Sequence, residues 1–232
     1  MAIGGKKGGL GELEENVFWT TMSDLMLGIA IVFMTLFVLA MTGFTQESIK
    51  IQENQMKATE ELVEKLKEEN IDAEVDKLTG NVKIKEIQLF DLNSYTLKPE
   101  GKVYLDKLIP IYLDTFLSKE DVANSITHIV IQGHTDSQSF IGLKTVEEQY
   151  AKNMELSLLR ANAVAEYALK TNFDKTNSER FRKMLVVEGR SFSDPVIIDG
   201  KEDYDKSRRV ELKVRVKARN FAKILGLNYG GD

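Results

Sequence analysis

The sequence predicts one membrane-spanning helix, a helical linker, and then an α+β domain with a mixed sheet and helices on one face. Three observations lead to this prediction. Residues 17–44 are almost entirely apolar, residues 45–70 are rich in charge and lack Pro and Gly, and residues 71–217 alternate between strand and helix patterns. An apolar helix of that length can cross a hydrocarbon core of about 30 Å, whereas alternating elements are typical of a folded domain.

The two ends of the chain and its composition narrow the possible functions. Residues 1–16 form a Gly-rich tail that we expect to be flexible, and residues 218–232 form a second tail with room for a short helix. The 232 residues carry a net charge of −5 and include two histidines but no cysteine. This composition excludes disulfides and thiolate chemistry, offers no basic patch for nucleic acid, and predicts neither a metal site nor a bound cofactor.

Asp24 is the one formal charge within residues 17–44. Placing a carboxylate at the centre of a membrane helix costs roughly 2.5–3.5 kcal/mol on insertion scales, so such a residue is a candidate ion or proton carrier, or a partner for another subunit. Steps of three and four residues place Thr21, Gly28 and Thr35 on the same face. Small and hydroxyl side chains in lipid belong against another helix or a water path, so these three are candidates to line a channel.

An alternative places Asp24 at the membrane surface, as the N-cap of a shorter span over residues 25–44. Ser23 and Asp24 have good capping chemistry, and about twenty residues suffice to span the membrane. Phe18 and Trp19, however, are typical interfacial anchors, and they lie one to two turns earlier. Their position favours a deeper Asp24.

Residues 45–70 are expected to continue the helix out of the membrane. A repeat of about 3.5 residues runs from Thr45 to Leu66, and a sustained repeat of this kind suggests two chains side by side. Several positions in the repeat are polar. A solvated single helix that acts as a spacer is therefore an equally good interpretation.

The domain is predicted to have the order β-β-α-β-α-β-β. The predicted strands are 71–77, 82–90, 126–132, 184–187 and 208–216, and the predicted helices are 99–117 and 156–169. Pro99 suits the first turn of a helix, and Gly80 suits the turn between the first two strands. Residues 137–152 are expected to be a polar connection, and residues 189–203 a loop.

This region contains a series of short motifs: Phe90-Asp91, Pro99-Glu100-Gly101, Ile131-Gln132-Gly133-His134-Thr135-Asp136, Asn153-Met154-Glu155-Leu156-Ser157, Arg160-Ala161 and Ser207-Arg208-Arg209-Val210-Glu211. Together they resemble an OmpA-like (OmpA/MotB C-terminal) peptidoglycan-binding domain. Their order and spacing agree with the predicted elements across residues 71–216. The chain departs from the family in a longer loop after Asp136 and in Ser207, where Asn or Asp is usual.

The resemblance implies a binding site for the diaminopimelate of peptidoglycan stem peptides. It assigns Asp136 and Arg160 to the ligand's ammonium and carboxylate, supported by Asn153 and Leu156. One acid and one guanidinium suit a ligand that carries both charges. The alternative is a structural ion pair in a domain that binds no cell wall. His134 reads as a turn residue, and without a nucleophile motif the chain is not expected to be an enzyme.

The membrane segment, residues 18–26, resembles the B subunits of MotB-type stators. That resemblance implies that Asp24 binds the transported H⁺ or Na⁺ and that a homodimer stands inside a pentamer of MotA-like or ZorA-like membrane subunits. It also implies a single-pass protein of the bacterial inner membrane, with a cytoplasmic N-terminus, a periplasmic domain, and residues 45–70 as a plug or spacer.

Short motif variants distinguish between stator types. Asn153 is followed by Met154 rather than Trp, and Ser207 precedes the two arginines; both variants are similar to ZorB-type subunits of the Zorya anti-phage system. The alternatives are a flagellar stator subunit of the MotB type and a passive, membrane-tethered peptidoglycan anchor.

Overall fold

The computed structural model describes residues 9–217, including the side chains of residues 16–42 and 49–217. Contacts divide the chain into two compact units, with the boundary between Ile49 and Lys50. The predicted C-terminal tail, 218–232, lies outside the described residues, as do residues 1–8 of the predicted N-terminal tail.

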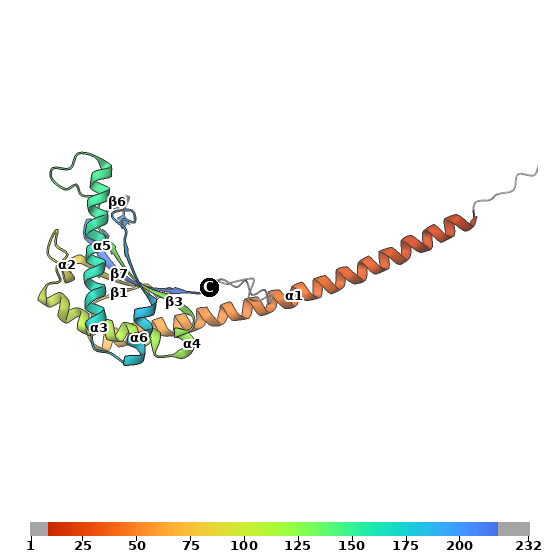
Figure 1. The fold of residues 1–232 in the computed structure, drawn as a ribbon, viewed down its shortest axis with the longest axis horizontal. Helices are drawn as coiled ribbons and strands as arrows, with labels where there is room; N and C mark the ends of the chain where they lie inside the picture. Colours follow the sequence, from red (N-terminus) through yellow and green to blue (C-terminus); the bar gives the residue numbers. More distant parts are fainter. Residues whose placement is uncertain (1–8, 218–232) are drawn as a thin grey trace, which may run out of the picture. The chain divides into compact units, whose positions relative to one another are not determined.

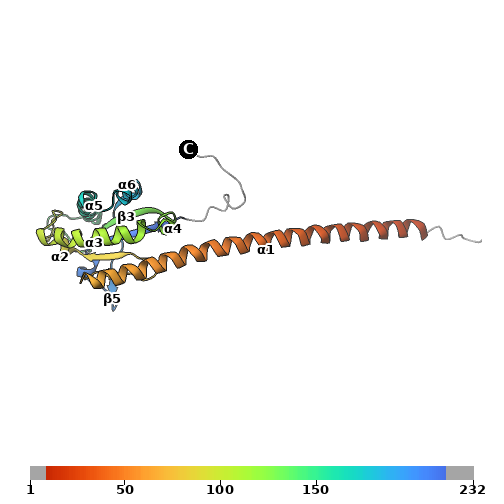
Figure 2. The ribbon, with the colours of Figure 1, turned by 90° about the horizontal axis from the view of Figure 1, so that it is seen from below.

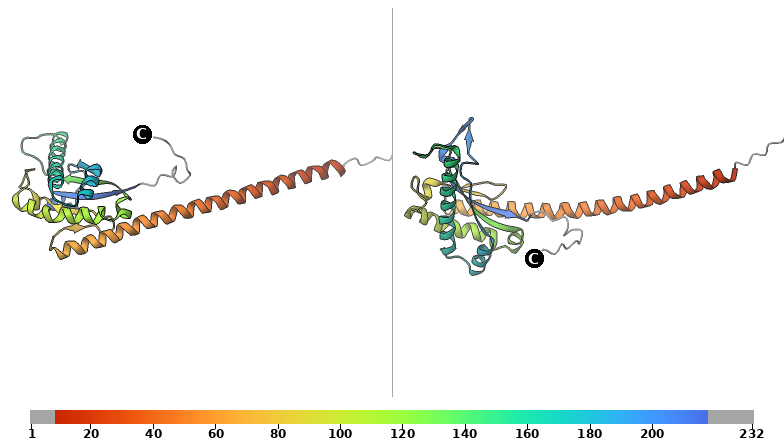
Figure 3. Two further views of the ribbon diagram at one scale, coloured as in Figure 1. Left: turned by 60° about the horizontal axis from the view of Figure 1, so that its bottom comes forward. Right: turned by 45° about the horizontal axis from the view of Figure 1, so that its top comes forward.

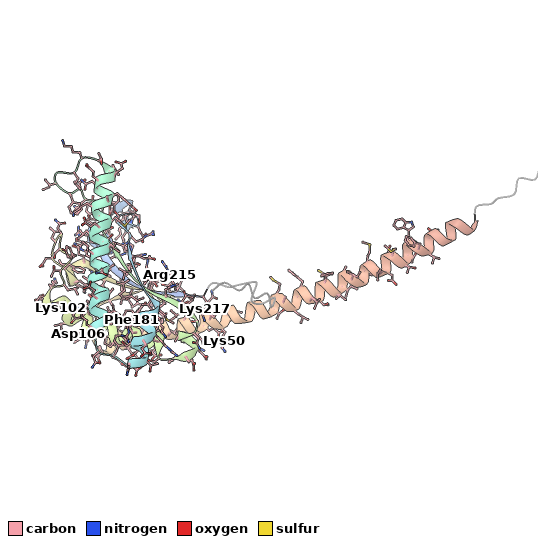
Figure 4. The ribbon with its side chains drawn as sticks, viewed as in Figure 1. Lys50, Lys102, Asp106, Phe181, Arg215 and Lys217 are labelled. Carbon is pink, nitrogen blue, oxygen red and sulfur yellow. The ribbon has the colours of Figure 1, made fainter. Side chains whose placement is uncertain are left out.

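Helix α1, Gly9–Glu68, contains 60 residues and begins inside the segment that was expected to be flexible. That expectation is wrong for residues 9–16, where leucines and glutamates favour a helix. Within α1, Asn16–Thr42 is the one stretch of the described chain long and apolar enough to cross a membrane. Its side chains are exposed all along the helix (Figure 4), as expected of a surface that lipid or another subunit covers.

The second unit is built on a five-stranded mixed sheet with the strand order β1-β2-β7-β3-β4. Its strands are β1 Glu74–Val75, β2 Val82–Lys85, β3 Ile126–His134, β4 Leu185–Gly189 and β7 Arg209–Val216. β3 pairs with β4 in parallel, and the other neighbours are antiparallel. The predicted mixed sheet is confirmed.

The two faces of the sheet differ in character. One row across it joins Val82, Leu212, Ile131 and Val187, all of which belong to the hydrophobic core or pack against it. The neighbouring row points to the opposite face and consists of Lys83, Glu211, Gln132 and Glu188. This alternation follows from the period of two along a strand, and it leaves only one face for the helices to cover.

Two long helices supply most of the cover for the apolar face. Helix α3, Pro99–Leu117, begins with a proline in its first turn, as predicted, and α5, Val146–Lys170, crosses the strands (Figure 1). Gly133 of β3 allows α5 to approach closely, because a Cβ at this position would lie 2.0 Å from the carbonyl oxygen of Ser157. The site residues on α5 are thereby held close to the end of β3.

Shorter elements complete the domain. They are α2 Glu86–Leu89, α4 Glu120–Ala123, α6 Lys175–Met184, α7 Tyr204–Ser207, and the hairpin of β5 Ile197–Ile198 with β6 Lys201–Glu202. α6 follows α5 closely and lies beside it (Figure 2), where Phe181 joins the core.

Several element predictions need correction. The strand predicted over 71–77 is only Glu74–Val75, and the loop predicted over 189–203 contains the β5–β6 hairpin. The strand predicted over 82–90 ends at Lys85, where the pairing with β7 ends and residues 86–89 turn into α2. The apolar alternation of the sequence also breaks there, because Glu86 follows Val82 and Ile84. The helix predicted over 156–169 begins at Val146, where Thr145 and Glu148 form a capping box. Helix α6 was not predicted, although Asp174 caps it through the backbone N–H groups of Thr176 and Asn177.

The last turns of α1 belong to the core of the domain. Ala58, Leu62 and Leu66 are buried in it, and this end of α1 runs alongside α3 (Figure 3). Gln55 Nε2 also donates to the carbonyl of Thr79, at 2.8 Å. Neither a coiled coil nor a solvated spacer includes this packing, so residues 55–68 have a structural role that the heptad pattern did not indicate.

Candidate functional site

The first candidate site lies on the apolar part of α1. Asp24 borders a shallow surface groove whose lining includes Thr21 and Gly28, while Thr35 borders a different groove. The structure therefore brings together three of the four residues that the sequence predicted for an ion path. Apart from the neighbouring residues and backbone of α1 itself, nothing described lies within 4 Å of a Cβ added at Gly28, which leaves room there for the close approach of another helix.

The threonine hydroxyl groups of the apolar stretch are satisfied by the helix itself. Thr21 Oγ1 donates to the carbonyl of Val17 at 2.7 Å, and Thr35 Oγ1 donates to the carbonyls of Ile31 and Val32 at 3.0 and 2.8 Å. These bonds make the hydroxyl groups tolerable in lipid. Asp24 differs because a carboxylate has no hydrogen to donate to a backbone carbonyl.

The second candidate site lies where β3 and β7 meet α5. Asp136 follows the end of β3 and is buried, with 6% of its surface exposed. Its Oδ1 accepts from the backbone N–H of Gln138 at 3.2 Å, and its Oδ2 accepts from Nη1 of Arg208, the residue just before β7. Asp136 thus pairs with Arg208 rather than with Arg160.

Arg160 lies on α5 and is 2% exposed. Its Nε donates to the carbonyl of Ser94 at 2.8 Å, and its Nη2 donates to Oε1 of Glu86 at 2.5 Å. The guanidinium carbon also lies 5.6 Å from the centroid of the Phe90 ring, a cation–π distance. Arg160 is therefore fixed by three different parts of the domain.

Sequence reasoning missed two members of this site, Arg208, which it quoted only as part of a family motif, and Glu86. Glu86 was placed inside a predicted strand, but it begins α2, where its backbone N–H donates to the carbonyl of Arg208 at 3.0 Å. Its Oε2 lies 3.5 Å from Nε of Arg208. Burial raises the pKa of Glu86, and the charges of Arg160 and Arg208 oppose that increase. Glu86 and Asp136 thus balance the two arginines in a buried cluster.

Asn153 and Leu156 also lie on α5 and are buried. Asn153 Nδ2 donates to the carbonyl of Gln149, in its own helix, at 3.0 Å. The long loop after Asp136 closes onto the same first turns of α5, because the side chain of Gln149 bonds to both the N–H and the carbonyl of Phe140. The predicted wall-binding residues of α5 therefore lie along the middle of that helix, and Asp136 and Arg160 are held by separate partners.

Ser207, the departure from the family pattern, has a structural role. It is fully buried, and its Oγ accepts from the backbone N–H of Val196 at 2.9 Å. That bond ties the segment before β7 to the β5–β6 hairpin, and it therefore helps to position Arg208.

A third polar cluster lies on the opposite face of the sheet. Ligand atoms of His134, Asp194 and Glu211 lie within 4.8 Å of one another, a spacing that could suit a metal ion. Both acids already have cationic partners, because Arg209 pairs with each of them and Lys213 Nζ lies 2.6 Å from Glu211 Oε2. The cluster is accordingly a charge-balanced network. His134, which was expected to be a turn residue, belongs to this network and is the last residue of β3.

Comparison with known proteins adds family evidence to this geometry. Residues 89–209 match the model of the OmpA family. The chain is 34% identical over 216 residues to Zorya protein ZorB of Escherichia coli strain ATCC 8739, covering 88% of this chain and 90% of that protein. It is 27% identical to Zorya protein ZorB of Escherichia coli O139:H28, covering 87% and 81%.

Among solved structures, the periplasmic domain of Helicobacter pylori MotB covers 67% of this chain and 87% of its own, with a TM-score of 0.47 and 17% identity. The family model covers more than half of the chain, and the match to the Escherichia coli ATCC 8739 protein extends over nearly all of both sequences. The chain therefore belongs to the ZorB family of Zorya proteins and carries a domain of the OmpA family.

Proposed function

We propose that this chain is the B subunit of an ion-driven membrane motor that is anchored to peptidoglycan and acts in anti-phage defence. The observation that carries the proposal is the pairing of a lone membrane carboxylate, Asp24, with an OmpA-family domain in one chain. Its membership of the ZorB family favours a Zorya system over a flagellar stator. The role is mechanical and transport-related, with no catalytic step.

The proposed assembly places two copies of the chain inside a pentamer of MotA-like or ZorA-like subunits in the bacterial inner membrane. The N-terminus is cytoplasmic and the domain periplasmic. The groove beside Asp24 and the open space at Gly28 support a close contact between α1 and another helix. The surrounding helices would then cover the apolar side chains that the single chain exposes.

In this proposal Asp24 takes up H⁺ or Na⁺ from one side of the membrane and releases it to the other. Moving one charge through about 100 mV is worth roughly 2.3 kcal/mol. A carboxylate that alternates between a hydrated and a sealed position can turn that energy into movement of the neighbouring subunit. The domain would hold the B subunits still against the cell wall while the outer ring turns.

The ion-carrying role is tested by replacing Asp24→Asn in cells that also make the neighbouring membrane subunit. We expect ion flux and phage protection to fall to background, because an amide has almost the same shape but carries no titratable proton. Asp24→Glu keeps the carboxylate and should retain part of the flux, and Ser23→Ala is the matched control at the adjacent position. Unchanged flux in Asp24→Asn would end the motor proposal.

The wall-binding role rests on the cluster that surrounds Arg160. Its test is sedimentation of the full-length chain with purified peptidoglycan sacculi that contain diaminopimelate. Asp136→Asn should weaken binding, because the ligand's ammonium loses its anionic partner. Thr42→Ala, in the membrane segment, should bind as the parent chain does. If the full-length chain does not sediment with sacculi, the buried cluster has only a structural role.

The rival function is a passive wall anchor without a motor. It predicts that Asp24→Asn changes nothing and that no multi-span membrane protein is purified with the chain. Family membership favours the motor, and co-purification with the product of the neighbouring gene separates the two functions directly.

A further inference from the structure

The wall-binding residues lie behind two other side chains. A cleft of about 610 Å³ opens beside α2, and its lining includes Glu86, Phe90 and Arg208 but neither Arg160 nor Asp136. Those two residues are 2% and 6% exposed, and Glu86 is itself 5% exposed, whereas the side chain of Arg208 is 20% exposed. A ligand that enters this cleft therefore meets Glu86 and Arg208 before it can reach the pair that is proposed to bind it.

The two covering side chains occupy the positions that the ligand's charges need. Oε1 of Glu86 accepts from Nη2 of Arg160 at 2.5 Å, as a ligand carboxylate would. Nη1 of Arg208 donates to Oδ2 of Asp136, as a ligand ammonium would. Oε2 of Glu86 lies 3.5 Å from Nε of Arg208, so the anion and the cation stand side by side, as they do at the zwitterionic end of diaminopimelate.

From this arrangement we infer that Glu86 and Arg208 form an internal stand-in for the zwitterionic ligand and keep the wall-binding site closed until a muropeptide displaces them. The inference rests on the proposed wall-binding function and adds a form of regulation to it. Binding then exchanges one pair of opposite charges for another, so the buried charges of Arg160 and Asp136 are never left unpaired.

Two features make the exchange physically feasible. Arg208 already donates through Nη2 to Asp205, an exposed carboxylate, so it has a second acceptor outside the site when it leaves Asp136. Glu86 is incompletely satisfied, because its buried Oε2 accepts no hydrogen bond from the described residues. An unsatisfied buried acceptor is unfavourable, and it lowers the resistance to displacement.

The test measures how variants of the full-length chain bind purified diaminopimelate-containing sacculi and free meso-diaminopimelate. Glu86→Gln keeps the size of the side chain but removes the charge that competes for Arg160. Arg208→Gln removes the cation that covers Asp136. We expect each variant to bind about tenfold more tightly than the parent chain, since each weakens one charged internal contact.

The matched controls are Glu188→Gln and Arg215→Gln. Nη2 of Arg215 lies 2.7 Å from Oε1 of Glu188 on the same sheet, so these two residues form an ion pair outside the site (Arg215 is labelled in Figure 4). Both controls should bind as the parent chain does. Thermal unfolding of every variant identifies any that fail to fold, and the partly exposed Arg208 provides a variant that is easier to accommodate than one at Glu86.

The outcomes separate this inference from the wall-binding proposal. If Glu86→Gln and Arg208→Gln bind more tightly than the parent chain, both the wall-binding proposal and the closed-site inference are supported. The same holds if the parent chain binds too weakly to measure and the two variants bind measurably. If the parent chain binds and both site variants bind equally or more weakly, wall binding stands and the closed-site inference is overturned. If neither the parent chain nor any folded variant binds, both are overturned.

Discussion

Helix α1 carries two sets of apolar side chains that have opposite surroundings in the single chain. Leu39, in the apolar stretch near the N-terminus, is 69% exposed, whereas Leu62, in the same helix, is fully buried in the domain core. The difference lies in the neighbours available and not in the helix itself. Residues 55–68 pack on the domain, while residues 16–42 must be covered by lipid or by other subunits.

The same contrast applies to charged groups. Asp24 is exposed on a bare helix, while Glu86 is buried between two arginines. A buried charge must be paired, so the domain contains both members of each ion pair within one chain. Because Asp24 is unpaired among the described residues of the single chain, we expect a second polypeptide to surround it. Glu86 and Asp136 are already paired within the domain, so we expect a ligand to bind there by replacing one member of each pair.

The largest expected effect comes from comparing two glycines. Gly133→Ala should prevent α5 from packing on β3, because the added Cβ would lie 2.0 Å from a backbone oxygen of Ser157. We expect destabilisation beyond the roughly 3 kcal/mol of ordinary overpacking, visible as loss of cooperative thermal unfolding. Gly28→Ala should leave domain unfolding unchanged and affect only assembly with other helices. Equal melting curves for the two variants would contradict the packing described here.

Two leucines of α1 provide the next comparison. Leu62→Ala should destabilise the domain by about 2–5 kcal/mol, as expected for a buried leucine whose removal leaves a cavity. Leu39→Ala should not change the denaturation midpoint of the domain, since its side chain touches none of the core. Chemical denaturation in detergent, followed by near-UV circular dichroism, measures both. If Leu62→Ala were as stable as the parent chain, α1 would not be part of the core.

A smaller effect is expected from acid. Burial lowers the pKa of His134 to about 4, with Arg209 contributing, so the folded domain keeps this histidine neutral below pH 6.5 while the unfolded chain protonates it. Stability should fall as pH drops from about 6.5 towards 4, by on the order of 2 kcal/mol at pH 5. His134→Gln should flatten this dependence, whereas replacement of the exposed His128 should not.

Below about pH 4.5 a second group adds to the loss. Burial alone would raise the pKa of Glu211, but contacts with Lys213 and Arg209 outweigh it and lower that pKa to about 2. A depressed carboxyl pKa stabilises the fold above its unfolded value, and that contribution is lost as pH falls towards 2. A stability profile that stayed flat from pH 7 to pH 3 would contradict both assignments.

Much of the fold could be predicted because its signals are local. Alternation of Val210, Leu212 and Val214 marks β7, and Pro99 marks the start of α3. Helix α6 was missed because it is short and strongly polar, with few apolar positions to show a period. The packing of Leu62 and Leu66 could not be read from the heptad pattern, which indicates an apolar stripe but does not identify what covers it.

The site was only partly predictable for a related reason. Family motifs located Asp136 and Arg160, but the partner of each depends on contacts between residues far apart in sequence. Arg160 meets Glu86, 74 positions away, and Asp136 meets Arg208, 72 positions away. Glu86 also lies just where the strand pattern breaks, so a strand interpretation gave it no special position.

The burial of Ala58, Leu62 and Leu66 has a practical consequence for domain exchange. In a chimera joined after residue 68, the transferred domain would lack these three side chains, because they would remain with the membrane segment. The part of the hydrophobic core that they cover would then be exposed to solvent. A junction placed before Gln55 would keep Ala58, Leu62 and Leu66 with the domain. It would also keep the hydrogen bond from Gln55 to the carbonyl of Thr79. In chimeras of this family, residues 55–68 of α1 should therefore be transferred together with the domain on which they pack.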